Sequence, residues 1–460
     1  MNLISQHKKV KKLSKYSASL ILLTVGLTRA NAQSVYPTGV TVYDPARAYN
    51  SYIIFSAPDN KTHLIDMNGN EIHTWNYAGF PGELLDPAVT GGKKGNVLIQ
   101  YESIKGIGTS ETPGQTIFRN KSIAELNWAG DVVWKWGDKA PDSTARQHHD
   151  WQRLPNGNTL VLANRLRPIP GFKLPKLLDD IIYEVNPDGD IVWTWNASDH
   201  LKEFGFTPEE LELVKNSSDA DYLHVNNMTS LGPNHWYDKG DERFNPDNIL
   251  IDSRNANFII IIDKKTGKVV WNLGHNYPAI NQRNSSVPRP VDQISGQHDA
   301  HLIEEGLPGA GNLIVFDNQG EAGYPSATLQ PTGGSRVLEI DPVTKTIVWQ
   351  YTGQDSDAPT WSFYSSFISS ARRLPNGNTL IDEGMHGRFF QITPKGEIVW
   401  EYVNPYFGRS PIGGISRTVR SNWVYRAQPV PYNWVPDGTA HAEKAIKVVD
   451  NATFRVPDSQ

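Results

Sequence analysis

The chain has 460 residues, with 14 Trp, 18 Tyr, 38 Gly and 31 Pro, and it contains no Cys. It is too long for one ordinary globular core unless the fold is a barrel, a propeller or another repeat. Its aromatic and turn-forming residues favour an all-β protein, and the lack of Cys excludes disulfides and thiol catalysis.

The N-terminus predicts a secretory signal peptide. Five Lys between positions 8 and 15 precede an apolar run over residues 18–27, and the Ala-Asn-Ala at 30–32 is a cleavage signal. The apolar run is too short to span a bilayer, so we expect export and cleavage before Gln33. An uncleaved membrane anchor is the alternative. Removing residues 1–32 takes away six positive charges and no acid, so the formal net charge moves from −5 to −11. Such an acidic protein is a poor partner for nucleic acid or an anionic membrane.

One phrase recurs six times: a polar turn, two apolar residues, Trp, then an aromatic or apolar residue. Recurrence of this kind is the signature of a repeat architecture. The copies read DMNGNEIHTWNY, LNWAGDVVWKWG, VNPDGDIVWTWN, DKKTGKVVWNLG, DPVTKTIVWQYT and TPKGEIVWEYVN. Their tryptophans are Trp75, Trp134, Trp193, Trp271, Trp349 and Trp400.

The third repeat shows the strands of one unit. HHDWQRL runs into PNG, then NTLVLAN, then IIYEV, the turn NPDG and DIVWTW. Alternating apolar residues make each run a half-buried strand, and Gly adopts the left-handed angle of the turns. Four antiparallel strands in each of six repeats predict a six-bladed β-propeller over residues 33–460, with Trp filling the gaps between blades. The first repeat lacks its innermost strand, which we expect segment 421–427 to supply, and the insertions 200–221 and 275–294 should be loops.

Three histidines fall on the predicted wall of the central channel. The innermost strand of each blade lines that channel, and QHHDWQRL, YLHVNNMTSL and GQHDAHLI place His149, His224 and His298 there at one shared position. Four interpretations compete: packing in a polar channel, a divalent metal site, a carboxylate-based hydrolase, and an anion site with a nucleophile.

Arg254 and Asn226 favour the anion site. Arg254, in NILIDSRNANFIIIID, lies just beyond the strand that bears His224, and Asn226 shares the face of His224. A guanidinium binds a tetrahedral oxyanion through two parallel hydrogen bonds and is a poor neighbour for a bound cation. These residues therefore predict an anion clamp, with a surface ion pair as the alternative for Arg254.

Several segments of the sequence resemble those of a known family. LHVNNMTSL, DSRN, GQHDAHLIEEGLPGAGNLIVFDN, SRVLEIDPVTKTIVWQY and RRLPNGNTLIDEGMHGRFFQITPKGEIVWEYVNP are similar to the bacterial periplasmic aryl sulfotransferases, over nearly all of residues 36–432. The resemblance implies transfer of a sulfuryl group from a small aryl sulfate donor to a phenolic acceptor, by a ping-pong mechanism through a sulfohistidine in the periplasm. It requires no metal and no organic cofactor. Well-studied members carry a disulfide, which this chain lacks, and the sequence leaves a homodimer open.

The resemblance also assigns roles by motif. His298 of GQHDA matches the nucleophile, His224 and Asn226 the H-x-N pair, and Arg254 the channel arginine. His149 of QHHD matches the remaining histidine, with the adjacent His148 as the alternative for that position.

Further residues are candidates for supporting roles. Asp299, or a backbone carbonyl, would fix the tautomer of His298. The candidates for substrate binding are His148, Asp299 and Arg388, with Arg388 at the channel mouth. We interpret His301 as structural, because strand faces alternate by two and it lies three residues from His298. The aromatic residues at 361, 363 and 364 are candidates for stacking on an aryl group, although packing is the simpler interpretation.

Two functions from other classes stay open. A non-catalytic extracytoplasmic propeller that binds anionic or sulfated ligands would keep Arg254 and Asn226 without needing a nucleophile. A metal-dependent propeller enzyme would use the histidines as ligands instead.

Overall fold

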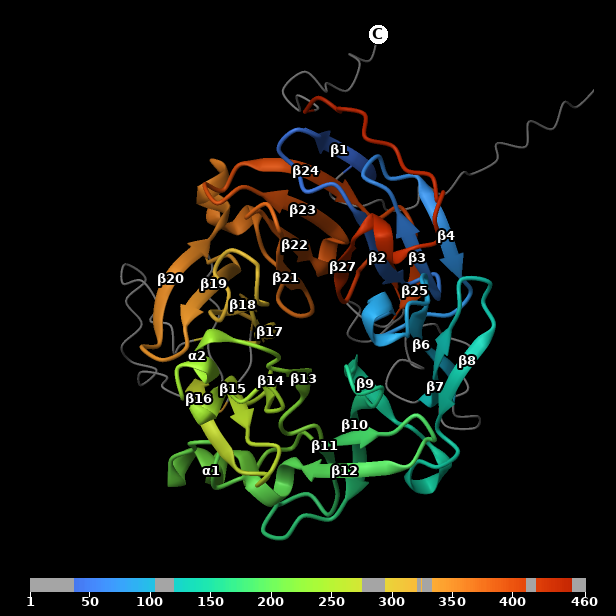
Figure 1. Cartoon of the computed structure of the whole chain (residues 1–460). Coiled ribbons are helices and arrows are strands. Elements are labelled where there is room, and N and C mark those ends of the chain that lie inside the picture. The colour runs from blue at the N-terminus through green and yellow to red at the C-terminus, as the bar shows by residue number, and fades with distance from the viewer. Residues whose placement is uncertain are drawn as a thin grey trace, which may run out of the picture. The chain divides into compact units, whose positions relative to one another are not determined.

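Six antiparallel sheets are arranged as the blades of a β-propeller, which confirms the predicted fold (Figure 1). The computed structural model describes residues 37–103, 120–274, 294–320, 324, 333–410 and 419–448. From the innermost strand outward, blade 1 consists of β27 (Ala427–Val430), β2 (Tyr52–Ala57), β3 (Lys61–Ile65) and β4 (Glu71–Trp75). Blade 2 consists of β5 (Glu83–Leu84), β6 (Val97–Ser103), β7 (Asn120–Leu126) and β8 (Val132–Trp136). Blade 3 consists of β9 (Gln147–Arg153), β10 (Thr159–Arg167), β11 (Leu177–Val185) and β12 (Ile191–Asn196).

The other three blades follow the same plan. Blade 4 consists of β13 (Val225–Ser230), β14 (Ile249–Ser253), β15 (Phe258–Ile262) and β16 (Val269–Gly274). Blade 5 consists of β17 (His298–Leu302), β18 (Leu313–Asp317), β19 (Arg336–Asp341) and β20 (Thr346–Tyr351). Blade 6 consists of β21 (Ser370–Arg373), β22 (Thr379–Glu383), β23 (Arg388–Ile392) and β24 (Ile398–Val403). Blade 6 has a fifth, outermost strand, β1 (Gly39–Tyr43), and β25 (Gly408–Ser410) pairs with β26 (Val419–Ser421) outside the blades.

The ring is closed by segments from both ends of the described chain. β27 supplies the innermost strand of blade 1 and pairs with β2 from Tyr52 opposite Val430 to Phe55 opposite Ala427. This strand begins where the predicted segment 421–427 ends, and residues 422–426, which precede the strand, are buried. The outer position of β1 was not predicted. No helix among the described residues is long and apolar enough to cross a membrane.

Tryptophans on the fourth strand, counted from the channel, connect each blade to the next. In every blade an indole N–H donates to a backbone carbonyl of the following blade, which satisfies the polar end of a large apolar ring. In blade 3 the donor is Trp195, two residues after the predicted Trp193. One pair from each blade is Trp75 with Asn127 (3.5 Å), Trp134 with Pro187 (3.1 Å), Trp195 with Gly267 (2.9 Å), Trp271 with Pro342 (2.7 Å), Trp349 with Pro394 (3.2 Å) and Trp400 with Met67 (2.7 Å). In blade 2, Trp136 adds a second bond of this kind, to Gly189 at 3.1 Å.

The apolar core is divided among the seams between blades. Each of six buried clusters combines side chains of two consecutive blades, for example Leu162 of β10 with Ile251 of β14. A blade therefore buries its faces only against its neighbours, as expected for repeats.

The insertion predicted to be a loop at 200–221 contains a short helix, α1 (Pro208–Lys215). Thr207 caps it, and Glu210 completes a capping box by bonding back to the Thr207 backbone, a sequence signal of a helix start. A second short helix, α2 (His235–Asp238), follows β13. The other insertion, 275–294, lies almost entirely outside the described residues.

Candidate functional site

The predicted site residues gather where the innermost strands of blades 3 to 6 begin. At this end of the channel the strands bulge: their pairing with the second strand shifts register in blades 3, 4 and 5. Residues there with left-handed backbone angles include His149 (φ 58°), His224 (φ 51°), Asp299 (φ 60°) and Ile368 (φ 56°). Bulges re-aim side chains, and such angles in non-glycine residues cost about 1–3 kcal/mol each and cluster at functional sites.

The hairpins that follow the innermost strands overturn the prediction that the three histidines share one position. In blades 3, 4 and 5 a backbone bond closes the hairpin after the innermost strand, which gives a common reference residue. Counting five residues back from it reaches His149, Asn226 and His298, whereas His224 lies two residues further from the turn. His224 nevertheless reaches the cluster, since its ring centroid lies 4.6 Å from that of His149. The reference bonds run from Leu154 to Asn158, Leu231 to Asn248 and Ile303 to Asn312.

His298 is held by hydrogen bonds at both ring nitrogens. Its Nδ1 lies 2.9 Å from the Gly296 carbonyl and 2.7 Å from Asn318 Oδ1, so Nδ1 carries the proton. Its Nε2 then accepts the backbone N–H of Ile368 at 3.0 Å. Burial, followed by the charge of Arg254, lowers the pKa of His298 well below its usual range. The imidazole is therefore neutral, with its lone pair on Nε2.

His149 and His148 form a second hydrogen-bonded unit. Their Nδ1 atoms lie 2.8 Å apart, and His148 Nε2 lies 3.2 Å from Asp180 Oδ1 on β11. This last contact is an ion pair whose angle departs from that of a straight hydrogen bond. His148 thus connects His149 to a carboxylate, which differs from the predicted substrate contact.

His224 and Arg254 occupy the blade 4 side of the cluster. His224 Nδ1 lies 2.5 Å from Asp221 Oδ2, and the Arg254 backbone N–H donates to the His224 carbonyl at 3.0 Å. Burial raises the pKa of Asp221, but the charge and hydrogen bond of His224 outweigh it and leave that pKa lowered. His224 is thereby oriented by a carboxylate.

Arg254 carries an uncompensated charge among the described residues. Its Nη1 donates to the neutral Asn255 Oδ1 at 3.0 Å, no described carboxylate lies within ion-pair distance, and its buried Nε has no described partner. Burial lowers the pKa of Arg254 against the attraction of Asp221 and Asp219. A partly buried cation with no carboxylate in ion-pair contact favours binding of an anion.

Asn226 has a structural contact that the sequence did not indicate. Its Nδ2 donates to the Gln297 carbonyl of blade 5 at 3.0 Å, and its backbone carbonyl accepts the hydroxyl of Tyr425. Its side-chain Oδ1 is buried without a described partner. Asn226 therefore links two blades at the position where blades 3 and 5 have histidines.

Two predicted substrate-binding residues are engaged elsewhere. Asp299 pairs with Arg372 at 2.5 Å and with Arg426 at 3.1 Å, so Gly296 and Asn318, and not Asp299, fix the tautomer of His298. Arg388 lies on β23, the third strand of blade 6, with ion pairs to Glu383 (2.8 Å) and Glu401 (2.6 Å). Both charges are compensated in place, so we remove both residues from the substrate-binding set.

The remaining predicted residues are dispersed. His301 donates from Nδ1 to the Asp299 carbonyl at 2.8 Å and lies away from the histidine cluster, in keeping with a structural role. Of the three aromatic candidates, Phe363 packs in the seam between blades 5 and 6, Trp361 is 62% exposed, and the Tyr364 N–H bonds to Glu383.

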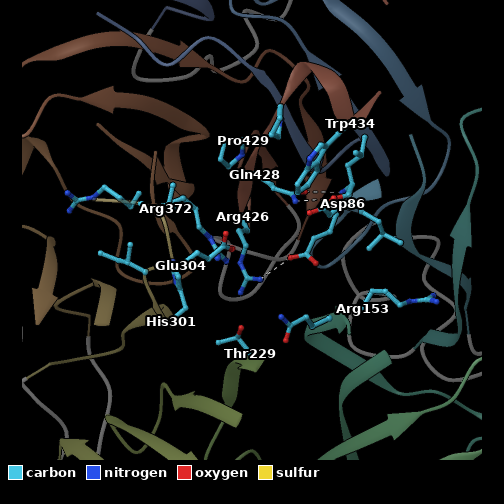
Figure 2. A pocket seen from close by; sticks show the side chains of 18 of the residues that line it. Asp86, Arg153, Thr229, His301, Glu304, Arg372, Arg426, Gln428, Pro429 and Trp434 are labelled. Carbon is cyan, nitrogen blue, oxygen red and sulfur yellow. Dashed lines mark hydrogen bonds and ion pairs between the residues drawn. The ribbon is translucent and has the colours of Figure 1, made fainter. Parts of the chain in front are cut away.

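A pocket of ≈340 Å³ occupies the other end of the channel. Arg426, Arg372 and His301 are among its lining residues (Figure 2). Equivalent strands of successive blades run in one direction along the channel, and this pocket is lined by their later residues, whereas the histidines lie at their start. The buried guanidinium of Arg426 bonds both oxygens of Asp150, at 2.9 and 3.1 Å, and pairs with Asp299.

Several residues of the cluster carried no motif in the sequence. Tyr425 lies with its ring centroid 5.6 Å from that of His149, and Phe80 at 5.0 Å from the same ring. Asp180 and Asp221 orient histidines from outside the innermost strands. The one available signal was the aromatic segment SNWVYRA, whose only predicted role was to close the ring. Among the described residues, no group of three or more His, Asp or Glu side chains is arranged to hold a metal ion.

Comparison with solved structures returned other proteins of low identity. They include a protein of unknown function from Bacteroides caccae (11% identity, TM-score 0.44, covering 83% of this chain and 99% of the other). A virginiamycin B lyase from Staphylococcus aureus has 12% identity, a TM-score of 0.37 and coverage of 81% and 86%. A putative 6-phosphogluconolactonase from Bacteroides fragilis has 10% identity, a TM-score of 0.37 and coverage of 83% and 98%.

Comparison with curated proteins found no significant match. Residues 63–406, which make up most of the chain, match the family described as arylsulfotransferase (ASST). This span includes all the histidines of the cluster and Arg254. The chain belongs to the arylsulfotransferase family.

Proposed function

We propose that this protein is an aryl sulfotransferase that works by a ping-pong mechanism through a sulfated His298. The single observation that carries the proposal is the uncompensated Arg254 beside three histidines, two of them buried. A sulfuryl group brings the negative oxygens that this cation lacks, and family membership supports aryl sulfate and phenol as the reactants.

In the first half-reaction, Nε2 of His298 attacks the sulfur of the aryl sulfate. An N–S bond forms, the S–O bond to the aryl group breaks, and the phenolate leaves with the electron pair. Charge spreads over the peripheral oxygens, as in phosphoryl transfer, so donors placed in advance stabilise the transition state. Arg254 is suited to that role, and His224 or His149 can protonate the departing phenolate.

Attack by His298 requires its bond with Ile368 to open. That hydrogen bond contributes about 0.5–1.5 kcal/mol. Ile368 is β-branched and has a left-handed backbone angle, φ 56°, which is a strained conformation for such a residue. Relief of that strain would offset part of the cost of freeing Nε2.

In the second half-reaction, the oxygen of an acceptor phenol attacks the sulfur while the N–S bond breaks. The phenol proton passes to the base that protonated the first phenolate, and His298 returns to its neutral form. One proton is released to the donor aryl group and one is taken from the acceptor, so the cycle balances.

Initial-rate kinetics test this function. With 4-nitrophenyl sulfate as donor and phenol as acceptor, we expect transfer whose double-reciprocal plots are parallel, as a ping-pong mechanism requires. Binding of the sulfate ester without any turnover would favour the non-catalytic binding protein instead. A stoichiometric transition metal whose removal abolishes activity would favour the metal-dependent enzyme.

We also propose export to the periplasm with loss of residues 1–32. Intact-mass measurement after expression with the native leader should show Gln33 as the first residue. A retained N-terminus would favour a membrane anchor.

A further inference from the structure

Asp180, His148 and His149 form a continuous line of side chains from β11 to the channel. His148 and His149 are consecutive on β9, where strand geometry would point them to opposite faces. The left-handed angle of His149 changes this and brings the two Nδ1 atoms within 2.8 Å. All three side chains are buried, and Val225 N–H and His148 both contact the Asp180 carboxylate.

The contact between two Nδ1 atoms restricts where the protons lie. One of the two nitrogens must donate and the other accept. His148 faces Asp180 through Nε2, and a carboxylate accepts, so that nitrogen carries a proton. Since Nδ1 of His149 is committed to His148, His149 can exchange a proton with a substrate only through Nε2.

The surroundings disfavour a positive charge on His149 itself. Burial, then the charges of His224, His148 and His298, and also Arg254, lower its pKa well below the usual range. Asp180 is the carboxylate at the other end of the line. Burial raises the pKa of Asp180, and His148 opposes this. A positive charge on His148 would face the Asp180 carboxylate at 3.2 Å, whereas a positive charge on His149 would face other cationic groups.

We propose that Asp180 and His148 are positioning residues that pass a proton to and from His149 during sulfuryl transfer, a role that rests on the proposed function. At the start His148 is an imidazolium that donates from Nδ1 to His149 Nδ1, and His149 carries its proton on Nε2. His149 gives the Nε2 proton to the leaving phenolate while the Nδ1 proton of His148 moves onto His149. The acceptor phenol later returns a proton to Nε2, and the Nδ1 proton passes back to His148. The positive charge therefore rests beside Asp180 and never has to remain on His149.

The other acid–base pair of the cluster is built differently. His224 contacts Asp221 directly, and it is 21% exposed at the side chain. Only His149 depends on a second histidine to reach a carboxylate. Two aryl sulfates with different leaving groups can distinguish a proton relay from a purely structural role. A nitrophenolate leaves without being protonated, whereas the more basic phenolate needs a proton as it leaves.

The test compares kcat/KM for phenyl sulfate and for 4-nitrophenyl sulfate in wild type and Asp180→Asn. Loss of general acid catalysis typically costs about 10²–10⁴-fold, so we expect at least about a 10²-fold loss with phenyl sulfate and less than about 10-fold with 4-nitrophenyl sulfate. His148→Phe, which keeps the size of the ring without its nitrogens, should show the same selective loss.

Asp179→Asn is the matched control. Asp179 is the preceding buried carboxylate on β11 and bonds to Ser198 and Tyr222, away from the histidines. We expect this variant to keep the wild-type ratio between the two donors. Equal losses with both donors in Asp180→Asn and His148→Phe, or no loss in either, would overturn the relay. A wild-type protein that transfers from neither donor would overturn the proposed function, and the relay with it.

Discussion

Arg254 and Arg426 lie toward opposite ends of one channel, and they differ in the carboxylates within reach. Arg426 bonds Asp150 through two nitrogens and pairs with Asp299, and these charges outweigh its burial and raise its pKa well above the usual range. Arg254 has no described carboxylate within ion-pair distance, and burial lowers its pKa. One guanidinium is paired with carboxylates inside the fold, whereas the other has no described carboxylate in ion-pair contact.

The same contrast extends to the residues around each arginine. Near Arg426, buried carboxylates connect blades by accepting backbone N–H groups of the next blade. Near Arg254, the backbone is strained, and Asp221 and Asp180 contact histidines instead of an arginine. The carboxylates at the Arg426 end therefore link blades, whereas those at the Arg254 end orient histidines. The three carboxylate links are Asp150 to Met228 (3.0 Å), Asp252 to Ala300 (3.0 Å) and Asp299 to Ala371 (3.2 Å).

The largest effect should come from removing the satisfied arginine. Arg426→Met leaves Asp150 as a buried charge without its ion-pair partner and leaves Asp299 with Arg372 alone. Breaking a buried pair in this way costs about 3–5 kcal/mol of stability. We expect a large fall in the thermal midpoint, with activity lost along with the fold. Arg254→Met is the control, and an equal fall in its midpoint would break the comparison.

The next largest effect is expected on turnover, from a change at Arg254, which has no described ion-pair partner. Arg254→Lys keeps the charge but loses the planar fork, so we expect turnover to fall by about 10²–10³-fold, as when one preorganised donor is removed. The thermal midpoint should stay close to that of wild type, since no described ion pair is broken. Wild-type turnover in this variant would make Arg254 a structural residue.

A smaller loss of stability should follow from replacing one of the tryptophans that connect neighbouring blades. Trp271→Phe leaves the Pro342 carbonyl without the bond that spans two blades at 2.7 Å, and we expect a loss of about 1–3 kcal/mol in stability. Turnover of the folded protein should not change. Trp193→Phe is the matched control, because Trp195 makes the corresponding bond in its blade. Equal losses in the two variants would mean that ring packing, and not the hydrogen bond, fastens the blades.

The repeated features of the fold were predictable from the sequence because every blade obeys the same physical constraints. A tryptophan on each outermost strand and a polar turn before it are required six times, so they recur in the sequence. Closure was less predictable, since β27 (Ala427–Val430) is short and contains Pro429, which weakens the strand pattern. The fifth strand of blade 6 has no counterpart in the other repeats.

The candidate site was predictable in its residue types but not in its register. His298 and Arg254 carry motifs, whereas the position of His224 depends on a bulge that shifts the strand relative to the turn. Asp180 meets His148 only because β11 and β9 belong to one blade. The contact from Ile368 uses a backbone N–H, which no side-chain pattern can reveal.

The central claim is that His298 carries the sulfuryl group. The protein should be incubated with 4-nitrophenyl sulfate without acceptor, kept alkaline to protect the acid-labile N–S bond, and mapped by peptide mass spectrometry. We expect one burst of nitrophenol per protein and one sulfuryl group on His298, and neither in His298→Asn, which should fold because the amide can replace one ring hydrogen bond. A label on His149, His224 or a tyrosine, or a burst that persists in His298→Asn, would contradict the account.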